Sequence, residues 1–318
     1  MSEPSAAVKK KEFLHQFHTE RFTWHDYITI ITLVVILLTV LESVFGSLIT
    51  APLTMFLDKN QPYVSVLLEY FITIGAWVAT IGYILITKYN RPIIHAITPR
   101  MKGNNWKMLG LGLLVGFVQN AFCILIAAWN KDIHLTFSGF EFFRLLILLI
   151  AVFIQSSSEE LICRGFIYQR LKRGHKSPLV WILGNSLIFA ALHLANPGIT
   201  FLAFMNIVLV AIFYSLVIYY FDASIWFTMA AHAAWNFTQN ILFGLPNSGI
   251  VSGYSMMLLD TANARNSFAY NINFGVEGTL LACIVIAVSI AVTWYFGSKR
   301  QPEDIDVWEI ADAAPENN

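Results

Sequence analysis

The stretch EFFRLLILLIAVFIQSSSEELICRGFIYQR, residues 141–170, is an apolar run that carries Glu159, Glu160 and Arg164 deep inside it. Its length is enough to cross a membrane, because a spanning helix needs about 20 mostly apolar residues. An ionisable side chain in hydrocarbon is costly, and such residues commonly serve catalysis or transport. The stretch therefore predicts a membrane helix that carries part of a functional site.

The composition places the rest of the chain in a membrane as well. Of its 318 residues, 57% are hydrophobic and only 13% are charged, whereas roughly 25% are charged in a typical soluble domain. The formal net charge is zero, so nothing in the charge predicts binding to nucleic acid. We expect an integral membrane protein with a lipid bilayer as its surroundings.

Apolar runs of spanning length recur along the chain and predict an all-α, polytopic fold of about eight transmembrane helices around a polar catalytic cavity. The fifth run is the least secure, because it is short and is closed by Asn196-Pro197-Gly198. The expected runs are approximately 27–49, 63–87, 107–129, 141–170, 178–195, 199–221, 224–243 and 276–297.

The basic residues predict the orientation. Fifteen Lys and Arg lie in the segments on the side of the N-terminus and three lie in the opposite loops, which by the positive-inside rule places both termini in the cytoplasm. We expect a basic cytoplasmic tail over 1–23, a membrane-embedded domain over 24–298 and an acidic cytoplasmic tail over 299–318. The outer stretch 244–275 is either a cap over this domain or a loop. If the source is prokaryotic, the membrane is expected to be the plasma membrane.

Gly112 and Gly116 are four residues apart in an apolar run. Two glycines at this spacing let a neighbouring helix approach closely. We expect this neighbour to belong to the same chain rather than to a second copy.

Polar side chains on three of the expected helices form pairs at the spacing i, i+4, which places both members of a pair on one helix face. The pairs are Glu160 with Arg164, Phe189 with His193, and His232 with Asn236. Each has an ordinary explanation: an ion pair that holds a helix, a packed histidine, or an amide that bridges helices. Together they predict a shared polar cavity. Glu159 lies about 100° around its helix from Glu160 and stays available.

This set of side chains suits peptide hydrolysis, which needs a base for water and donors for the oxyanion. Glu159 would be the general base, with water held jointly by His193. His232 and Asn236 would form the oxyanion hole, and Arg164 would hold Glu160 in place. The chain has no HExxH motif, no GxSxG motif and no pair of deep aspartates, so other types of intramembrane hydrolase are not indicated.

The motifs EExxxR (Glu159–Arg164), FxxxH (Phe189–His193) and HxxxN (His232–Asn236) resemble, in order and spacing, those of the CPBP family of CAAX proteases and bacteriocin-processing enzymes, also called Abi. The resemblance covers about 140–249. It implies an eight-helix intramembrane endopeptidase similar to the type II CAAX prenyl proteases, whose eukaryotic members remove the last three residues of prenylated proteins. It also implies the roles given above for the motif residues.

Several alternatives remain open. Zinc held by Glu159, His193 and His232 is possible in principle, although we favour a metal-independent site without a cofactor. The substrate is expected to be a lipidated or membrane-associated peptide, but a bacteriocin-processing or self-immunity role fits the same family. A proton-coupled transporter is a further alternative, which the absence of internal repeats disfavours. The oligomeric state is not predicted.

Overall fold

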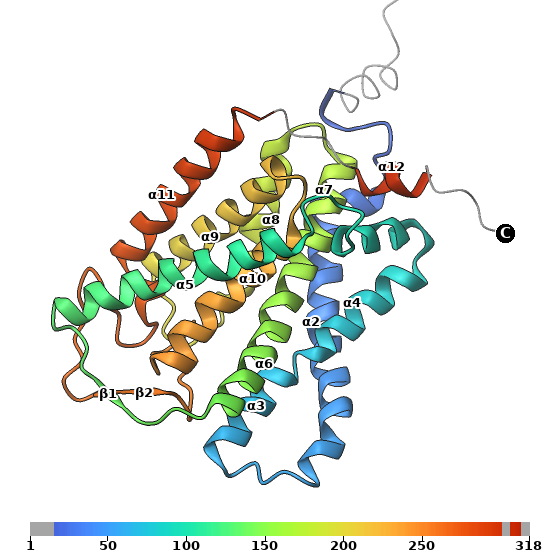
Figure 1. Ribbon diagram of the computed structural model, residues 1–318. Coiled ribbons are helices and arrows are strands. Elements are labelled where there is room, and N and C mark those ends of the chain that lie inside the picture. The colour runs from blue at the N-terminus through green and yellow to red at the C-terminus, as the bar shows by residue number, and fades with distance from the viewer. Residues whose placement is uncertain (1–15, 301–305, 313–318) are drawn as a thin grey trace, which may run out of the picture.

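The computed structural model describes residues 16–300 and 306–312, and they are mostly helical (Figure 1). Their one sheet pairs two short antiparallel strands, β1 (Leu135–Phe137) and β2 (Met257–Leu259). The tails expected at 1–23 and 299–318 lie largely outside these residues. The all-α fold class is confirmed.

Six helical segments of the described residues are long and apolar enough to cross a membrane, which confirms a polytopic integral membrane protein. The second segment is broken into α3 and α4, and the fourth continues from α6 through a π-helix into α7 (Tyr168–Gly174). The segments are α2 (Ile28–Thr54), α3 (Pro62–Phe71) with α4 (Ile74–Ile86), α5 (Trp106–Trp129), Phe142–Gly174 with α6 at Phe142–Glu160, α9 (Phe201–Tyr220) and α11 (Leu280–Gly297).

The count of eight spans is not confirmed, because two of the expected runs form shorter helices. Helix α8 (Pro178–Leu192) has 15 residues and α10 (Ile225–Asn236) has 12. The chain leaves α8 through a turn that contains Gly198, whose φ of 73° favours glycine. Helix α10 is buried on nearly all sides, as expected of an apolar helix inside a bundle. Both short helices end at the polar residues predicted for the site.

Shorter helical turns connect these helices. The 3-10 turns are η1 (Trp24–Asp26), η2 (Lys88–Ile97) and η5 (Val276–Gly278), and the π-helices are η3 (Leu161–Ile167) and η4 (Phe237–Leu242). A last helix, α12 (Val307–Asp312), packs against η2.

Helices α5 and α10 approach each other at two glycines. A Cβ atom on Gly112 would lie 2.3 Å from the carbonyl oxygen of Phe227, and one on Gly116 would lie 2.1 Å from that of Ala231. Only a residue without a side chain fits at such distances. The expectation that these glycines serve packing within the chain is therefore confirmed.

We expect Gly116→Val to lower the thermal stability and the yield of folded protein, because α5 would be forced away from α10 next to His232. Overpacking of this kind typically costs about 1–3 kcal/mol. Gly110→Val is the matched control on the same helix, since nothing lies within 4 Å of its added Cβ. Thermal unfolding in detergent followed by tryptophan fluorescence measures the difference. Equal unfolding temperatures for the two variants would contradict this account of the packing.

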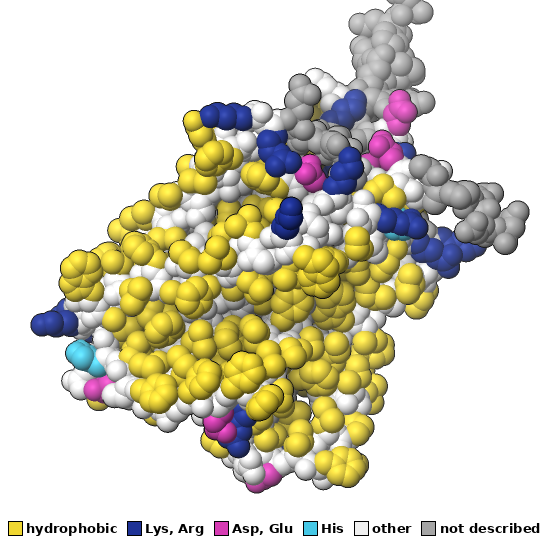
Figure 2. Space-filling view, viewed as in Figure 1, with side chains coloured by type: hydrophobic (Ala, Val, Ile, Leu, Met, Phe, Trp, Pro, Cys, Tyr) yellow, Lys and Arg dark blue, Asp and Glu magenta, His cyan; other side chains and the backbone are white. Residues whose placement is uncertain are grey.

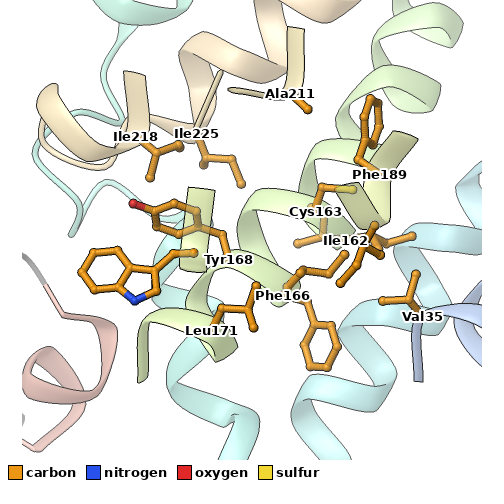
Figure 3. Packing of buried hydrophobic residues seen from close by; sticks show 14 of the residues in the cluster. Val35, Ile162, Cys163, Phe166, Tyr168, Leu171, Phe189, Ala211, Ile218 and Ile225 are labelled. Atoms are coloured by element: carbon orange, nitrogen blue, oxygen red, sulfur yellow. The ribbon is translucent and has the colours of Figure 1, made fainter. Parts of the chain in front are cut away.

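An apolar core surrounds the π-helix η3 (Figure 3). Phe166 of η3 and Leu171 of α7 belong to one buried cluster with Val35 of α2, Phe189 of α8 and Ile225 of α10. All five side chains are buried. This packing fixes the helix that carries Glu159 against the two short helices.

The surface agrees with a membrane environment. Figure 2 shows hydrophobic side chains over most of one face, with Lys and Arg gathered mainly at the end where α7 and α12 lie. A basic end next to an apolar belt is the arrangement that the positive-inside rule describes. The cytoplasmic placement of this end stays a prediction.

Candidate active site

Both motif helices change from α to π geometry directly after their polar residues. Helix α6 ends at Glu160 and η3 begins at Leu161, while α10 ends at Asn236 and η4 begins at Phe237. A π segment inserts an extra residue per turn, and such segments occur frequently at functional sites. The two π-helices therefore begin directly after Glu160 and Asn236, which belong to two of the three sequence motifs.

Glu159 lies between the two predicted histidines. Its Oε1 accepts a hydrogen bond from Gln155 Nε2. Its Oε2 has no hydrogen-bond partner and lies 3.9 Å from His193 Nε2 and 3.8 Å from His232 Nε2. The structure thus brings together three side chains that are separated by up to 73 positions in the sequence.

His193 lies just beyond the C-terminal end of α8. Its Nδ1 is 2.9 Å from the carbonyl oxygen of Phe189, and because a carbonyl oxygen only accepts, Nδ1 carries the proton. In the neutral ring, Nε2 is then an acceptor that faces Glu159. The Phe189 ring also packs against the His193 ring, with centroids 4.6 Å apart.

His232 is held by Glu160 rather than by a backbone group. The Nδ1 atom of His232 donates to Glu160 Oε1 at 3.0 Å, so its Nε2 is left to face Glu159. A carboxylate on Nδ1 orients an imidazole and favours its protonated form. Sequence reasoning assigned Glu160 to Arg164 alone and missed this second contact.

The predicted pair of Glu160 and Arg164 is present and fully buried. Arg164 Nη1 donates to Glu160 Oε1 at 2.9 Å, and its Nη2 donates to the carbonyl oxygen of Ala211 at 3.2 Å. The guanidinium carbon lies 4.9 Å from the ring centroid of Phe189 and 5.3 Å from that of Tyr214. Arg164 thereby ties the helix of Glu159 to α8 and α9.

Asn236 faces α6 from the end of α10. Its Nδ2 donates to Gln155 Oε1 at 3.1 Å and to Ser156 Oγ at 3.2 Å. Gln155 therefore links Asn236 to Glu159. Sequence reasoning missed Gln155, although its position one helical turn before Glu159 is a signal that could have found it.

A cavity of about 350 Å³ inside the bundle is lined by Gln155, Glu159, His193, His232 and Asn236. Its wall also includes Glu42 and Glu69 from α2 and α3, and Asn247 and Ser248 from the loop after η4. The outer stretch 244–275 thus contributes to the cavity wall. Both glutamates fall within expected spans, so their charge was a signal available in the sequence.

Glu277 fixes the loop that forms this wall. Its Oε1 accepts from Trp235 Nε1 at 2.8 Å, and its Oε2 accepts from the Ser248 backbone N–H at 2.8 Å and from the Ser248 hydroxyl at 3.0 Å. Burial raises the pKa of Glu277 above its ordinary value, although these hydrogen bonds act in the other direction.

Comparison with known families agrees with this geometry. Residues 141–238 match the family model of the type II CAAX prenyl endopeptidase Rce1-like proteins. This segment is therefore similar to Rce1-like proteins. It contains all three motifs, from Glu159 to Asn236, and the family resemblance predicted from them is confirmed. At the level of the family, the match favours a CAAX-type intramembrane endopeptidase.

The chain is also similar to an uncharacterized protein of Bacillus subtilis (strain 168), YyaK. The two are 32% identical over 169 residues, which is 48% of this chain and 53% of the relative. The chain thus matches about half the length of this curated relative. No solved structure matches the chain significantly.

The zinc alternative concerns the donor groups of Glu159, His193 and His232. In the part of the chain that the structure describes, no three His, Cys, Asp or Glu side chains are arranged to hold a metal ion. No step below therefore passes through a metal. The metal-independent mechanism stays a proposal.

Proposed function

We propose that this protein is an intramembrane endopeptidase that cleaves near the C-terminus of a prenylated CAAX-type or other membrane-associated peptide. One observation carries the proposal: Glu159 Oε2 faces the Nε2 atoms of His193 and His232 inside a cavity of the bundle. The match to Rce1-like proteins supports the choice of a CAAX-type substrate.

Water activation falls to Glu159 and His193. Two atoms 3.9 Å apart can share one water oxygen at about 2.8 Å from each. The water donates one proton to Glu159 Oε2 and the other to His193 Nε2, which is an acceptor when Nδ1 bonds Phe189. As the oxygen attacks the peptide carbonyl carbon, Glu159 takes the proton as general base.

Oxyanion stabilisation falls to His232 and Asn236. With Glu160 on Nδ1, the protonated His232 ring donates from Nε2 to the oxygen that becomes negative. Asn236 Nδ2 adds a second donor when it exchanges Gln155 or Ser156 for the substrate. The carbon–nitrogen bond then breaks, and Glu159 returns its proton to the leaving amine.

The test uses the purified protein in detergent with a fluorogenic farnesylated CAAX peptide and its unprenylated counterpart, with products identified by mass spectrometry. We expect cleavage of the farnesylated peptide, no effect of a chelator, and a loss of about a hundredfold or more in His193→Ala, as for removal of a group that positions a reacting proton. Cleavage that a chelator abolishes and zinc restores would replace the mechanism by a metal-dependent one.

A comparison of the same variants in liposomes tests the transporter alternative. If the wild type cleaves neither these peptides nor unprenylated membrane-associated peptides, while Glu159→Gln abolishes proton uptake in liposomes, the protease proposal is wrong.

A further inference from the structure

Two carboxylates that the proposed mechanism does not use belong to the same cavity. Glu42 on α2 and Glu69 on α3 line it together with Glu159. Within the described residues, the side chains of Glu42 and Glu69 have no hydrogen bond and no ion pair. Unpaired acids in a cavity that also holds the reacting groups are candidates for binding part of the substrate.

Glu42 lies deep within a membrane-spanning helix. It is fifteenth in the 27-residue helix Ile28–Thr54, about 21 Å from its start at 1.5 Å per residue. A carboxylate near the middle of a membrane helix is costly and marks a functional site by default. Glu69 lies at the rim, where its side chain is more exposed.

Close helix packing holds this side of the cavity in place. A Cβ atom on Gly46 would lie 2.1 Å from the carbonyl oxygen of Ile72, and one on Gly75 would lie 2.1 Å from that of Glu42. Helix α2 therefore packs closely against the break between α3 and α4 and against the start of α4. An irregular backbone at membrane depth is tolerated where it lines a polar cavity, and Thr73 at this break does line it.

Asn247 supplies an independent observation. It is only 8% exposed and lines the same cavity, and its Oδ1 is buried without a hydrogen-bond partner. Its loop is closed by mutual backbone hydrogen bonds with Ile250 at 2.9 Å. Tyr70, a neighbouring hydroxyl in the wall, already donates to Asn240 at 2.8 Å. A buried acceptor without a hydrogen bond costs free energy, and a ligand that donates a hydrogen bond to it removes this cost.

We propose that Glu42, Glu69 and Asn247 form a subsite for a positively charged side chain of the substrate, a Lys ammonium or an Arg guanidinium close to the bond that is cleaved. All three offer acceptor oxygens, and an ammonium or guanidinium offers only donors. This inference rests on the proposed peptidase function and names a specificity that the function alone does not require.

The chemistry of the subsite favours a cationic side chain over a bound metal ion. Among the described residues, these acids do not belong to any group of three His, Cys, Asp or Glu that could hold a metal. A site whose acceptors pair with a cationic side chain discriminates against a neutral analogue, because the acceptors are then left unpaired. The expected readout is therefore discrimination between a basic residue and a neutral one of similar length.

The experiment measures kcat/KM for farnesylated CAAX peptides that keep the farnesylated cysteine and carry lysine or norleucine at the position directly before it or directly after it. The enzymes are wild type, Glu42→Gln, Glu69→Gln and the double variant. Glu141→Gln is the matched control, since Glu141 is exposed and pairs with Arg144 outside the cavity wall. The lysine to norleucine ratio is independent of the folded fraction, because one preparation cleaves both peptides.

We expect the wild type and Glu141→Gln to prefer lysine at one position by about tenfold or more, as for a desolvated charge pair. The double variant should lose this preference. Kd values of the same peptides, measured by fluorescence anisotropy, give the same ratio for any variant that does not cleave. Equal rates for lysine and norleucine in the wild type, or a preference that survives in the double variant, would overturn the subsite. A wild type that cleaves no peptide overturns the peptidase proposal itself.

Discussion

Glu159→Gln is expected to lower kcat/KM for the farnesylated peptide by about a thousandfold or more, since a positioned general base contributes up to about ten-thousandfold. The amide keeps an oxygen to accept the bond from Gln155 Nε2, but it cannot take a proton from water. Folding should be preserved, because Glu159 Oε2 has no hydrogen-bond partner to lose and the side chain is 31% exposed. Initial rates and thermal unfolding of the same sample measure the two effects separately.

Glu141→Gln is the control for removing a carboxylate from the same helical region, since Glu141 directly precedes α6 and has an exposed side chain. It should retain wild-type activity. Glu159→Asp keeps the carboxylate, but the shorter side chain places it farther from the histidines. The activity of this variant should therefore lie between that of Glu159→Gln and that of the wild type. A Glu159→Gln enzyme that keeps a tenth of the wild-type rate would show that the base lies elsewhere.

The convergence of the motif residues could be predicted from the sequence because it depends on local spacing. Pairs at i, i+4 share a helix face in any α-helix, and polar side chains in membrane helices turn inward. Once Glu159, His193 and His232 were assigned to three membrane helices, a common cavity was the expected outcome. The all-α membrane fold followed in the same way from composition and apolar length.

Other features depend on how helices cross, which spacing does not determine. Glu42 reaches the cavity because α2 packs against the break in the second span at Gly46 and Gly75. The apolar pattern predicted two further full spans where α8 and α10 are shorter helices, and it carries no signal for the two π-helices. The contact of Glu160 with His232 joins residues 72 positions apart, and the spacing of the motifs does not show it.

Arg164→Met has the largest expected effect on stability. It leaves Glu160, which is fully buried, without its guanidinium partner, and breaking a buried pair in this way typically costs about 3–5 kcal/mol. The cation–aromatic contacts with Phe189 and Tyr214 are lost as well. We expect a markedly lower unfolding temperature in detergent and a large fall in activity, because the helix of Glu159 loses its tie to α8 and α9.

The double variant Glu160→Gln/Arg164→Met separates stability from chemistry. With both charges removed, no uncompensated charge stays buried, so much of the lost stability should return. Activity should not return, because His232 Nδ1 then donates to a neutral amide oxygen that no longer favours the protonated ring. Unfolding temperatures and kcat/KM for the wild type, both single variants and the double variant complete the cycle. Recovery of activity together with stability would mean that Glu160 serves Arg164 alone and that His232 needs no carboxylate to donate to the oxyanion.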